Sequence, residues 1–207
     1  MKVAIVNYGM GNLGSVRRAF EDLDVQAVIA EHPAALFEAN RIVLPGVGAF
    51  SEGMARLRAR GWVDALQRLV RDEGRPLLGI CLGMQMLASA GDEGGHNPGL
   101  GLIDGEVLRL DTLGCTLRVP HVGWNELGFT DGEPLFAHIP QQSDFYFVHS
   151  YAFRARQQDN VIATTAYGVP VVAAVRSGRV FGTQFHPEKS SKAGRQLLRN
   201  FLDVVPC

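Results

Sequence analysis

The stretch Pro76–Leu87, PLLGICLGMQML, predicts a β-strand that ends at a cysteine and turns directly into a helix. Its first half, Pro76–Ile80, is a short apolar run typical of a buried strand, and Leu82–Ala90 favours a helix. Glycine stands two residues before and two residues after Cys81. This is the cysteine form of the Gly-x-Ser-x-Gly turn, in which a strained central residue presents its side chain at the end of a sheet.

Strands and helices alternate on the amino-terminal side of this turn. The expected strands are Val3–Val6, Val25–Ala30, Arg41–Leu44 and Pro76–Ile80. The expected helices are Ser15–Leu23 with Ser15 as a candidate N-cap, Ser51–Glu73 with a break near Gly61, and Leu82–Ala90. Such alternation predicts a parallel sheet with helices on both faces, because each crossover returns the chain over the sheet.

The second half of the chain consists of short apolar runs separated by glycine, proline and aspartate, and it ends in an amphipathic helix. The expected elements are strands Val107–Leu110, Thr116–Val119, Phe145–Val148, Val161–Ala166, Val171–Val175 and Val180–Thr183, a hairpin turn at 176–179 and a helix over Ser190–Leu202. No linker or repeat separates them. We therefore expect one α/β domain over residues 1–207, with an open, mostly parallel, flavodoxin-like sheet and antiparallel β additions in the second half.

Composition excludes several classes of protein. The hydrophobic content of 46% and the formal net charge of −1 are ordinary for a globular chain, and no basic field would attract nucleic acid. No signal peptide or membrane span is apparent at the start of the sequence. The three cysteines form no Cys-x-x-Cys pair, and no spacing of ligands matches a metal site. We therefore expect a cytoplasmic protein without metal or membrane partner.

A cysteine nucleophile needs a base, and the base needs a group that orients it. In VFGTQFHPEKS, His186 follows an apolar strand, and Pro187 biases His186 toward extended geometry. Residues two apart in an extended segment point the same way, so Glu188 can hydrogen-bond one ring nitrogen while the other faces Cys81. For each segment alone the alternatives are a buried unreactive cysteine and a surface His-Pro turn. Together the segments favour a Cys-His-Glu triad.

Acyl chemistry also requires N–H donors for a developing oxyanion. The Leu82 amide, which follows the nucleophile, is one such donor. The segment LPGVGAF follows the strand Arg41–Leu44, so it emerges at the same carboxyl edge of the sheet as Cys81. The candidates for the second donor are therefore Gly46, Val47 and Gly48. An ordinary strand–helix turn is the alternative for this segment.

A competing motif opens the chain. VNYGMGNLGS, Val6–Ser15, contains Gly-x-Gly-x-x-Gly, and Glu31 lies near the end of the next apolar run, as in a dinucleotide-binding fingerprint. In that fingerprint the first glycine follows the strand directly, whereas here Asn7 and Tyr8 intervene and place a bulky ring where a pyrophosphate would approach. The motif therefore favours another role, and a nucleotide-binding oxidoreductase or regulatory domain stays as the alternative from a different class.

GICLGMQ together with FHPEKS resembles the class I, triad-type glutamine amidotransferases over essentially the whole chain. Within that class, NYGMGNLGSV, LPGVGAF, PHVGWNE and FYFVHSY resemble the glutaminase subunits of imidazole glycerol phosphate synthases, which act in histidine biosynthesis. The resemblance implies hydrolysis of L-glutamine through a thioester on Cys81 and transfer of the ammonia to a (β/α)₈-barrel cyclase subunit in a heterodimer. It implies no cofactor. A glutaminase subunit of another synthase, for pyridoxal phosphate or anthranilate, is the enzymatic alternative.

The resemblance also implies roles for individual residues. The segment 46–48 would be the oxyanion strand, while Gln85 and Glu93 would bind the amino-acid end of glutamine. Glu93 matches the family pattern only by its offset from Cys81. The residues expected to close the substrate pocket are His149, Ser150 and Tyr151. Those expected at the interface with the cyclase are Asn12, Trp124 and Lys189.

Overall fold

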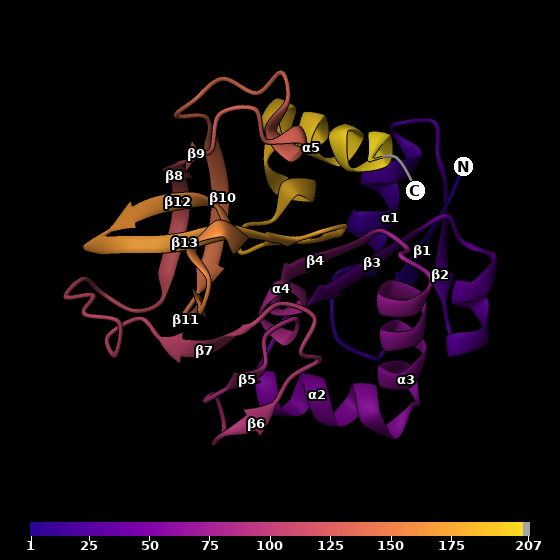
Figure 1. The fold of residues 1–207 in the computed structure, drawn as a ribbon. Helices are drawn as coiled ribbons and strands as arrows, with labels where there is room; N and C mark the ends of the chain where they lie inside the picture. The colour runs from indigo at the N-terminus through magenta and orange to yellow at the C-terminus, as the bar shows by residue number, and fades with distance from the viewer. Residues whose placement is uncertain (205–207) are drawn as a thin grey trace.

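Eight strands form the central sheet of the computed structural model, which describes residues 1–204 (Figure 1). The order is β2-β1-β3-β4-β14-β13-β12-β9, and the first five strands run parallel while the last three continue antiparallel. The parallel strands are β1 (Lys2–Val6), β2 (Gln26–Ala30), β3 (Arg41–Gly46), β4 (Leu77–Cys81) and β14 (Val180–Thr183). The antiparallel strands are β13 (Val169–Ser177), β12 (Val161–Tyr167) and β9 (Gly128–Phe129). The predicted α/β fold class is confirmed.

Helices cover both faces of this sheet. Figure 1 shows α1 (Leu13–Glu21) and α5 (Ser191–Asp203) on one face and α2 (Phe50–Ala59), α3 (Trp62–Gln67) and α4 (Leu82–Met86) on the other. The alternation along β1 explains both layers, because Val3 and Ile5 pack with Phe20 of α1 whereas Ala4 and Val6 belong to the core beneath α2 and α3. The shorter helical turns are η1 (Pro33–Glu38), η2 (Arg68–Asp72), η3 (Pro134–Phe136), η4 (Gln158–Asn160) and η5 (Pro187–Lys189).

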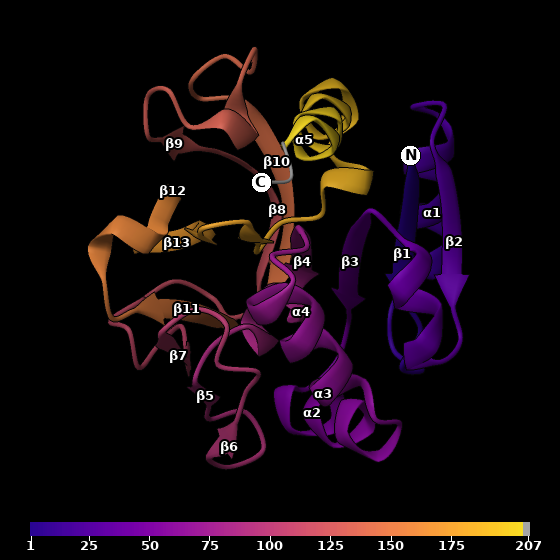
Figure 2. The same cartoon turned by 45° about the vertical axis from the view of Figure 1, so that its right-hand side comes forward.

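Two small sheets stand beside the central one (Figure 2). An antiparallel ribbon pairs β8 (His121–Glu126) with β10 (Asp144–His149), and a four-stranded sheet has the order β11-β7-β5-β6. The strands of the second sheet are β5 (Ala90–Gly91), β6 (Asn97–Pro98), β7 (Gly105–Arg109) and β11 (Tyr151–Ala155). Residues 149–151 join β10 of the ribbon to β11 of this sheet, so this short connection is fixed by a paired strand at each end.

Three expectations about individual elements are wrong. The helix expected to reach Ala90 ends at Met86, because Ala90 pairs with β6 and β7 instead. Residues 116–119 form an irregular segment with bends rather than a strand. The N-cap of α1 is Asn12 rather than Ser15, since the Asn12 side chain accepts a hydrogen bond from the Ser15 amide at 3.3 Å.

Two of the longer strands were not expected. β8 and β11 each carry a mixed sequence, and each is held by an antiparallel partner that the local pattern does not reveal. By contrast, the expected helix break is present at Gly61, which adopts a left-handed φ of +70°. The expected hairpin between β13 and β14 is present as well.

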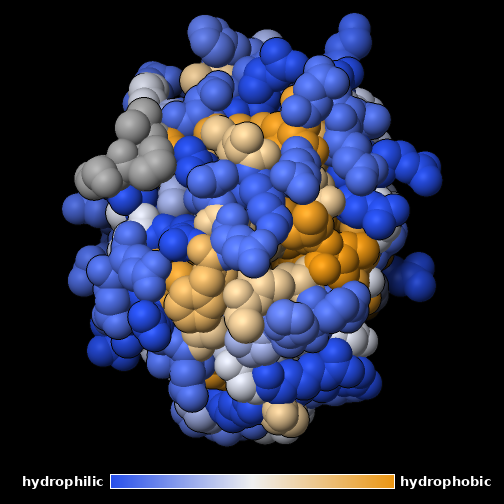
Figure 3. Space-filling model, turned by 90° about the vertical axis from the view of Figure 1, so that its right-hand side faces the viewer, coloured by the Kyte–Doolittle hydropathy of each residue, from blue (hydrophilic) through white to orange (hydrophobic). Residues whose placement is uncertain are grey.

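The outer surface carries both hydrophilic and exposed apolar side chains. Figure 3 shows the face at the β2 side, where hydrophilic side chains surround apolar patches. No helix within residues 1–204 is long and apolar enough to cross a membrane. On the ribbon of β8 and β10, Val122 pairs with Val148 and Trp124 pairs with Tyr146. Val122, Trp124 and Val148 are exposed large apolar side chains.

Candidate active site

The strained turn at the end of β4 is the structural centre of the site. Cys81 has a φ of +54°, which lies in the left-handed region that non-glycine residues rarely adopt, and α4 begins at the next residue. A Cβ atom on Gly83 would lie 1.7 Å from the carbonyl oxygen of Leu44, and one on Gly79 would lie 2.7 Å from backbone atoms of Gly83. Both flanking positions therefore require glycine for this turn to form.

His186 and Glu188 form a buried pair next to the cysteine. The Nδ1 atom of His186 lies 2.8 Å from Oε1 of Glu188, and the two side chains are only 4% and 2% exposed. Burial alone would lower the pKa of His186, but hydrogen bonding and charge from Cys81 and Glu188 outweigh it and raise the pKa to about 9. Because Nδ1 faces the carboxylate, Nε2 is the atom left for proton transfer.

The Nε2 atom of His186 is buried and makes no hydrogen bond of ordinary geometry within residues 1–204. The residue His186 nevertheless lines the same cavity as Cys81, and the Cys81 side chain contributes to the raised pKa of the His186 ring. Catalytic hydrogen bonds often form fully only in the substrate complex, so an Nε2 atom without a partner is consistent with a base that engages the nucleophile when substrate binds.

One cavity of about 470 Å³ brings most of the predicted residues together. Its size suits a small polar molecule. Gly46 and Glu188 are the two members of the predicted catalytic and substrate sets that do not line it, since Gly46 pairs with Cys81 in the sheet and Glu188 lies behind His186. The lining residues are Val47, Gly48, Ala49, Cys81, Leu82, Gln85, Glu93, Pro120, Val148, His149, Ser150, Tyr151 and His186.

The predicted oxyanion segment borders the cavity at the end of β3. Gly48 has a φ of +108°, and Val47 is 45% exposed, so its backbone is not enclosed by the core. Behind the segment, the buried hydroxyl of Tyr8 occupies the place of a side chain at Gly46, where a Cβ atom would lie 2.2 Å from it. Glycine is therefore required at position 46.

Glu93 and Gln85 line the cavity with different hydrogen-bonding capacity. Oε2 of Glu93 accepts a hydrogen bond of 2.9 Å from the amide of Phe50, at the start of α2, and burial raises the pKa of Glu93. Nε2 of Gln85 already donates to the carbonyl of Tyr151 and to Oε1 of Gln184, both at 3.0 Å. The oxygen of the Gln85 amide is therefore the atom that remains for a ligand.

Gln184 is the residue of this site that sequence reasoning missed. It is fully buried, and its Nε2 atom lies 3.7 Å from Sγ of Cys81. The available signal was its position at the end of β14, two residues before His186. Gln184 follows the strand that leads to the predicted base, and a buried glutamine amide at such a position must have hydrogen-bond partners.

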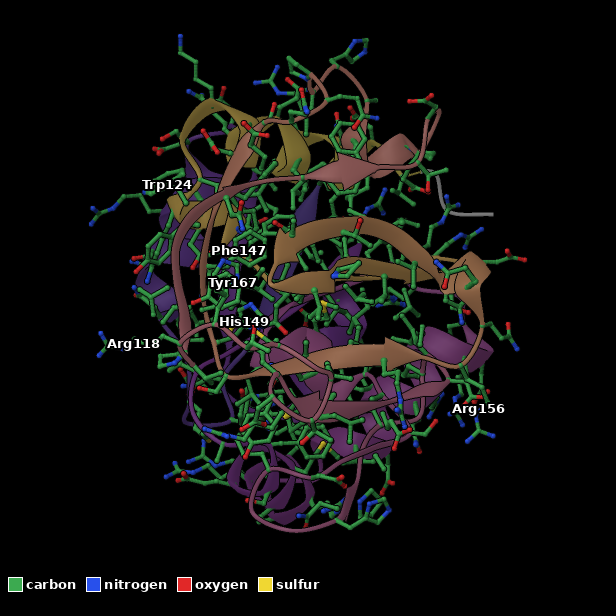
Figure 4. All side chains as sticks on the ribbon, turned by 90° about the vertical axis from the view of Figure 1, so that its left-hand side faces the viewer. Arg118, Trp124, Phe147, His149, Arg156 and Tyr167 are labelled. Atoms are coloured by element: carbon green, nitrogen blue, oxygen red, sulfur yellow. The ribbon has the colours of Figure 1, made fainter. Side chains whose placement is uncertain are left out.

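Two neutral histidines hold the far wall of the cavity. The ring of His121 stacks between Phe147 and Tyr167, with centroid distances of 4.8 and 4.0 Å. Its Nδ1 atom lies 3.0 Å from Nε2 of His149, and Nδ1 of His149 lies 2.8 Å from the carbonyl of Tyr151. Figure 4 shows Phe147, Tyr167 and His149 close together beside the ribbon. Burial lowers the pKa of both histidines to about 4, so both are neutral at pH 7.

The residues predicted for a partner interface lie around the carboxyl edge of the sheet. Trp124 is 53% exposed and packs edge-on against Tyr146, whose ring also lies 5.7 Å from the Nζ atom of Lys189. Asn12 is exposed at the start of α1, where it caps the helix. The structure thus gives Asn12 a structural role that the sequence prediction did not include.

The opening loop does not have the features of a dinucleotide site. Tyr8 is fully buried in the core, and the Glu31 carboxylate accepts a hydrogen bond from the Asn7 amide at 2.8 Å. Arg56 and Arg60 of the α2 region donate to the carbonyls of residues 9 and 7. The glycines therefore shape a loop that is tied to α2, with the acid already paired. Within residues 1–204, no group of three or more His, Cys, Asp or Glu side chains could hold a metal ion.

A strained cysteine at a strand–helix turn, beside a buried histidine–glutamate pair, defines a thiol amidotransferase site on an α/β sheet. Residues 4–205 match the family model described as "Glutamine amidotransferase class-I", and the chain belongs to that family. A solved structure described as a glutamine amidotransferase has the same fold, with a TM-score of 0.75, 22% identity and 96% of each chain covered. A second, a glutamine amidotransferase from Thermotoga maritima, has a TM-score of 0.68 and 18% identity over 98% of this chain and 83% of that one.

Within the class, the chain belongs to the HisH family. It is 46% identical over 203 residues to "Imidazole glycerol phosphate synthase subunit HisH" of Moorella thermoacetica, with 98% of this chain and 95% of the relative covered. It is 45% identical over 204 residues to the protein of the same name from Geobacter sulfurreducens, with 97% of each covered. The resemblance that the sequence motifs indicate is thereby confirmed.

Proposed function

We propose that the chain is the glutaminase subunit of an imidazole glycerol phosphate synthase and acts in histidine biosynthesis. The observation that carries this proposal is the buried 2.8 Å pair of His186 and Glu188 beside the strained Cys81, in a cavity that suits an amino acid. The family membership and the names of the relatives support the substrate and the pathway.

The reaction begins with attack of the Cys81 sulfur on the side-chain amide carbon of L-glutamine. His186 accepts the thiol proton at Nε2 and donates it to the departing nitrogen, so that ammonia leaves and a γ-glutamyl thioester remains. Water then attacks the thioester, His186 accepts its proton and returns it to the sulfur, and glutamate is released. The Glu188 carboxylate stabilises the imidazolium form of His186 during both steps. The backbone amides of Leu82 and Val47 are the proposed donors to the oxyanion.

The other end of glutamine is held by polar groups across the cavity. A carboxylate that burial has pushed toward its neutral form gains from an ammonium partner, so Glu93 is the proposed ligand of the α-amino group. The free oxygen of the Gln85 amide adds a second acceptor. The backbone from His149 to Tyr151, fixed by the histidine pair, closes the pocket around the substrate.

The apolar face of the ribbon is the proposed docking surface for the cyclase. Val122, Trp124 and Val148 are all exposed there, and Val148 also lines the cavity. Exposed apolar residues next to a reaction site are typical of a protein–protein interface. A (β/α)₈-barrel partner seated on this face, with Asn12 and Lys189 at its margin, would receive ammonia from the cavity without loss to solvent. We place this heterodimer in the cytoplasm.

Glutamine hydrolysis measured alone, and then with the cyclase and its nucleotide substrate, tests the proposal. We expect the partner to stimulate hydrolysis and Cys81→Ala to abolish it. Trp124→Ala should raise by about tenfold the cyclase concentration needed for half-maximal stimulation, which is the usual effect of losing an exposed aromatic anchor. Phe37→Ala, which removes an aromatic side chain exposed elsewhere, is the matched control. Hydrolysis by Cys81→Ala, or stimulation only by a different synthase, would contradict the proposal.

A further inference from the structure

The buried amide of Gln184 contacts the nucleophile directly. Its Nε2 atom lies 3.7 Å from Sγ of Cys81, a distance at which an N–H group can donate to the large sulfur atom. Gln184 follows β14, which is the strand next to β4, so the two residues meet across neighbouring strand ends. Its side chain has no access to solvent, which means that all its hydrogen bonds are made within the protein.

The neighbouring hydrogen bonds determine which end of this amide faces the sulfur. The carbonyl of Tyr151 can only accept, so Gln85 must present its NH₂ group to it. The same NH₂ group lies 3.0 Å from the Gln184 amide, which must therefore offer its oxygen. Since Oε1 of Gln184 is committed to Gln85, its NH₂ group points at Cys81. The Tyr151 carbonyl thus fixes the orientation of the Gln85 amide, which in turn fixes that of the Gln184 amide.

A second branch of hydrogen bonds ends on the same carbonyl. Nδ1 of His149 donates to Tyr151 O, so its Nε2 must accept from Nδ1 of His121. Both histidines are neutral at pH 7 because burial lowers their pKa values to about 4. The two lone pairs of the Tyr151 carbonyl are therefore occupied by Gln85 and His149, and the network keeps its polarity throughout the neutral pH range.

We propose that Gln184 is a further catalytic residue, whose amide N–H stabilises the Cys81 thiolate, and that Gln85 and the Tyr151 carbonyl hold it in the donating orientation. A hydrogen bond to an anionic acceptor is roughly twice as strong as one to a neutral acceptor, so the contact favours thiolate over thiol. The amide has no ionisable proton, and it supports the nucleophile without competing with His186 for the proton. This role rests on the proposed glutaminase function.

The pH dependence of Cys81 alkylation tests the contact without requiring turnover. Iodoacetamide labelling between pH 5 and 10, followed peptide by peptide with mass spectrometry, separates Cys81 from the other cysteines. We expect Gln184→Met, which preserves the volume and removes the donor, to move the midpoint of Cys81 labelling upward by about one pH unit. We also expect the kcat for glutamine to fall about tenfold at pH 7 with KM changed less than twofold.

Two control variants and one alternative variant of Gln184 complete the experiment. Gln67→Met removes a partly buried glutamine amide that donates to the carbonyl of Leu100, remote from the cavity, and should leave the labelling midpoint unchanged. Gln85→Met frees the oxygen of Gln184 from its donor, and should move the midpoint upward by a smaller amount than Gln184→Met. Gln184→Asn keeps an amide but withdraws it from the sulfur, so it provides the same test with a polar side chain should Gln184→Met not fold.

An unchanged midpoint in a folded Gln184 variant would overturn the proposal. Loss of kcat without a shift of the midpoint would also overturn it, because that result assigns Gln184 a purely structural role. Absence of glutamine hydrolysis by the unmodified chain would instead refute the proposed function, while the labelling profile would still report on the contact between Gln184 and Cys81.

Discussion

Replacement of Glu188 by glutamine tests the part of the site that the geometry defines most sharply. The change keeps the shape of the side chain and removes a negative charge 2.8 Å from Nδ1 of His186, where both side chains are almost fully buried. A charge-assisted hydrogen bond is stronger than a neutral one by about 1–1.5 kcal/mol. This difference corresponds to about one pKa unit. We therefore expect the pKa of His186 to fall from about 9 by about one unit.

The same difference sets a lower bound on the loss of activity. About 1.4 kcal/mol of lost imidazolium stabilisation slows about tenfold the two steps in which His186 accepts a proton. The amide can also donate its own N–H to Nδ1, which selects the wrong tautomer of His186 and adds to the loss. Glutamine hydrolysis as a function of pH gives the rate, and NMR titration of the His186 ring gives the pKa.

The stability of the protein provides an independent check, with a definite sign. A histidine whose folded pKa is raised contributes stability that is complete below its unfolded pKa, about 6.5, and that is lost as the pH rises through about 9. The difference in unfolding free energy between the unmodified chain and Glu188→Gln should therefore be largest near pH 6 and smallest above pH 9.

Glu133→Gln provides the matched control for this pH dependence. Glu133 is also mostly buried, but its partner is Arg176 at 3.0 Å, which stays charged throughout this range. Its effect on unfolding should therefore be the same from pH 6 to pH 9. A His186 pKa that is unchanged in Glu188→Gln, or a loss of stability with the same flat profile as the control, would refute the assigned role of Glu188.

Two further predictions concern the backbone that positions the site, and urea unfolding measures both. Gly83→Ala should lose more than about 3 kcal/mol, because its Cβ atom would lie 1.7 Å from the Leu44 carbonyl, whereas Gly14→Ala, with open space around its Cβ atom in α1, should gain about 0.5–1 kcal/mol. A loss in both would contradict the steric explanation. Asn12→Ala should lose about 1 kcal/mol through the lost N-cap, while Asn12→Asp should retain stability yet weaken cyclase binding. Unaltered cyclase binding by Asn12→Asp would remove Asn12 from the proposed interface.

The sequence by itself determined the first four parallel strands of the sheet, β1 to β4, and the nature of the nucleophile's turn. Apolar runs ending in glycine are local signals, and a strand–helix turn at Cys81 follows from residues within a few positions of it. The pairing of His186 with Glu188 is local too, although the conformation differs from the expected one. Glu188 lies in the helical turn η5 rather than in an extended segment, and its carboxylate still reaches Nδ1 of His186. The Cys81 turn and the His186–Glu188 pair can therefore be predicted from neighbouring residues alone.

Local signals failed where the pairing partner is distant in the sequence. β8 and β11 became strands because of the strands beside them. Residues 116–119 are apolar enough to suggest a strand, but they pair with no strand and form an irregular segment with bends. The N-cap at Asn12 rather than Ser15 shows that even a helix start depends on which side chain the loop brings to the free amides.

The tertiary structure alone decided how the site is assembled. Cys81 and His186 are 105 residues apart in sequence (186 − 81), and they meet because β14 pairs with β4. The same pairing brings Gln184 to the sulfur, and the junction of β10 with β11 brings the Tyr151 carbonyl to the amide that orients it. In such a network, each buried group fixes which end of its neighbour donates and which accepts, and the neighbours are distant in sequence. No local pattern of residues therefore contains this information, which exists only once the chain is folded.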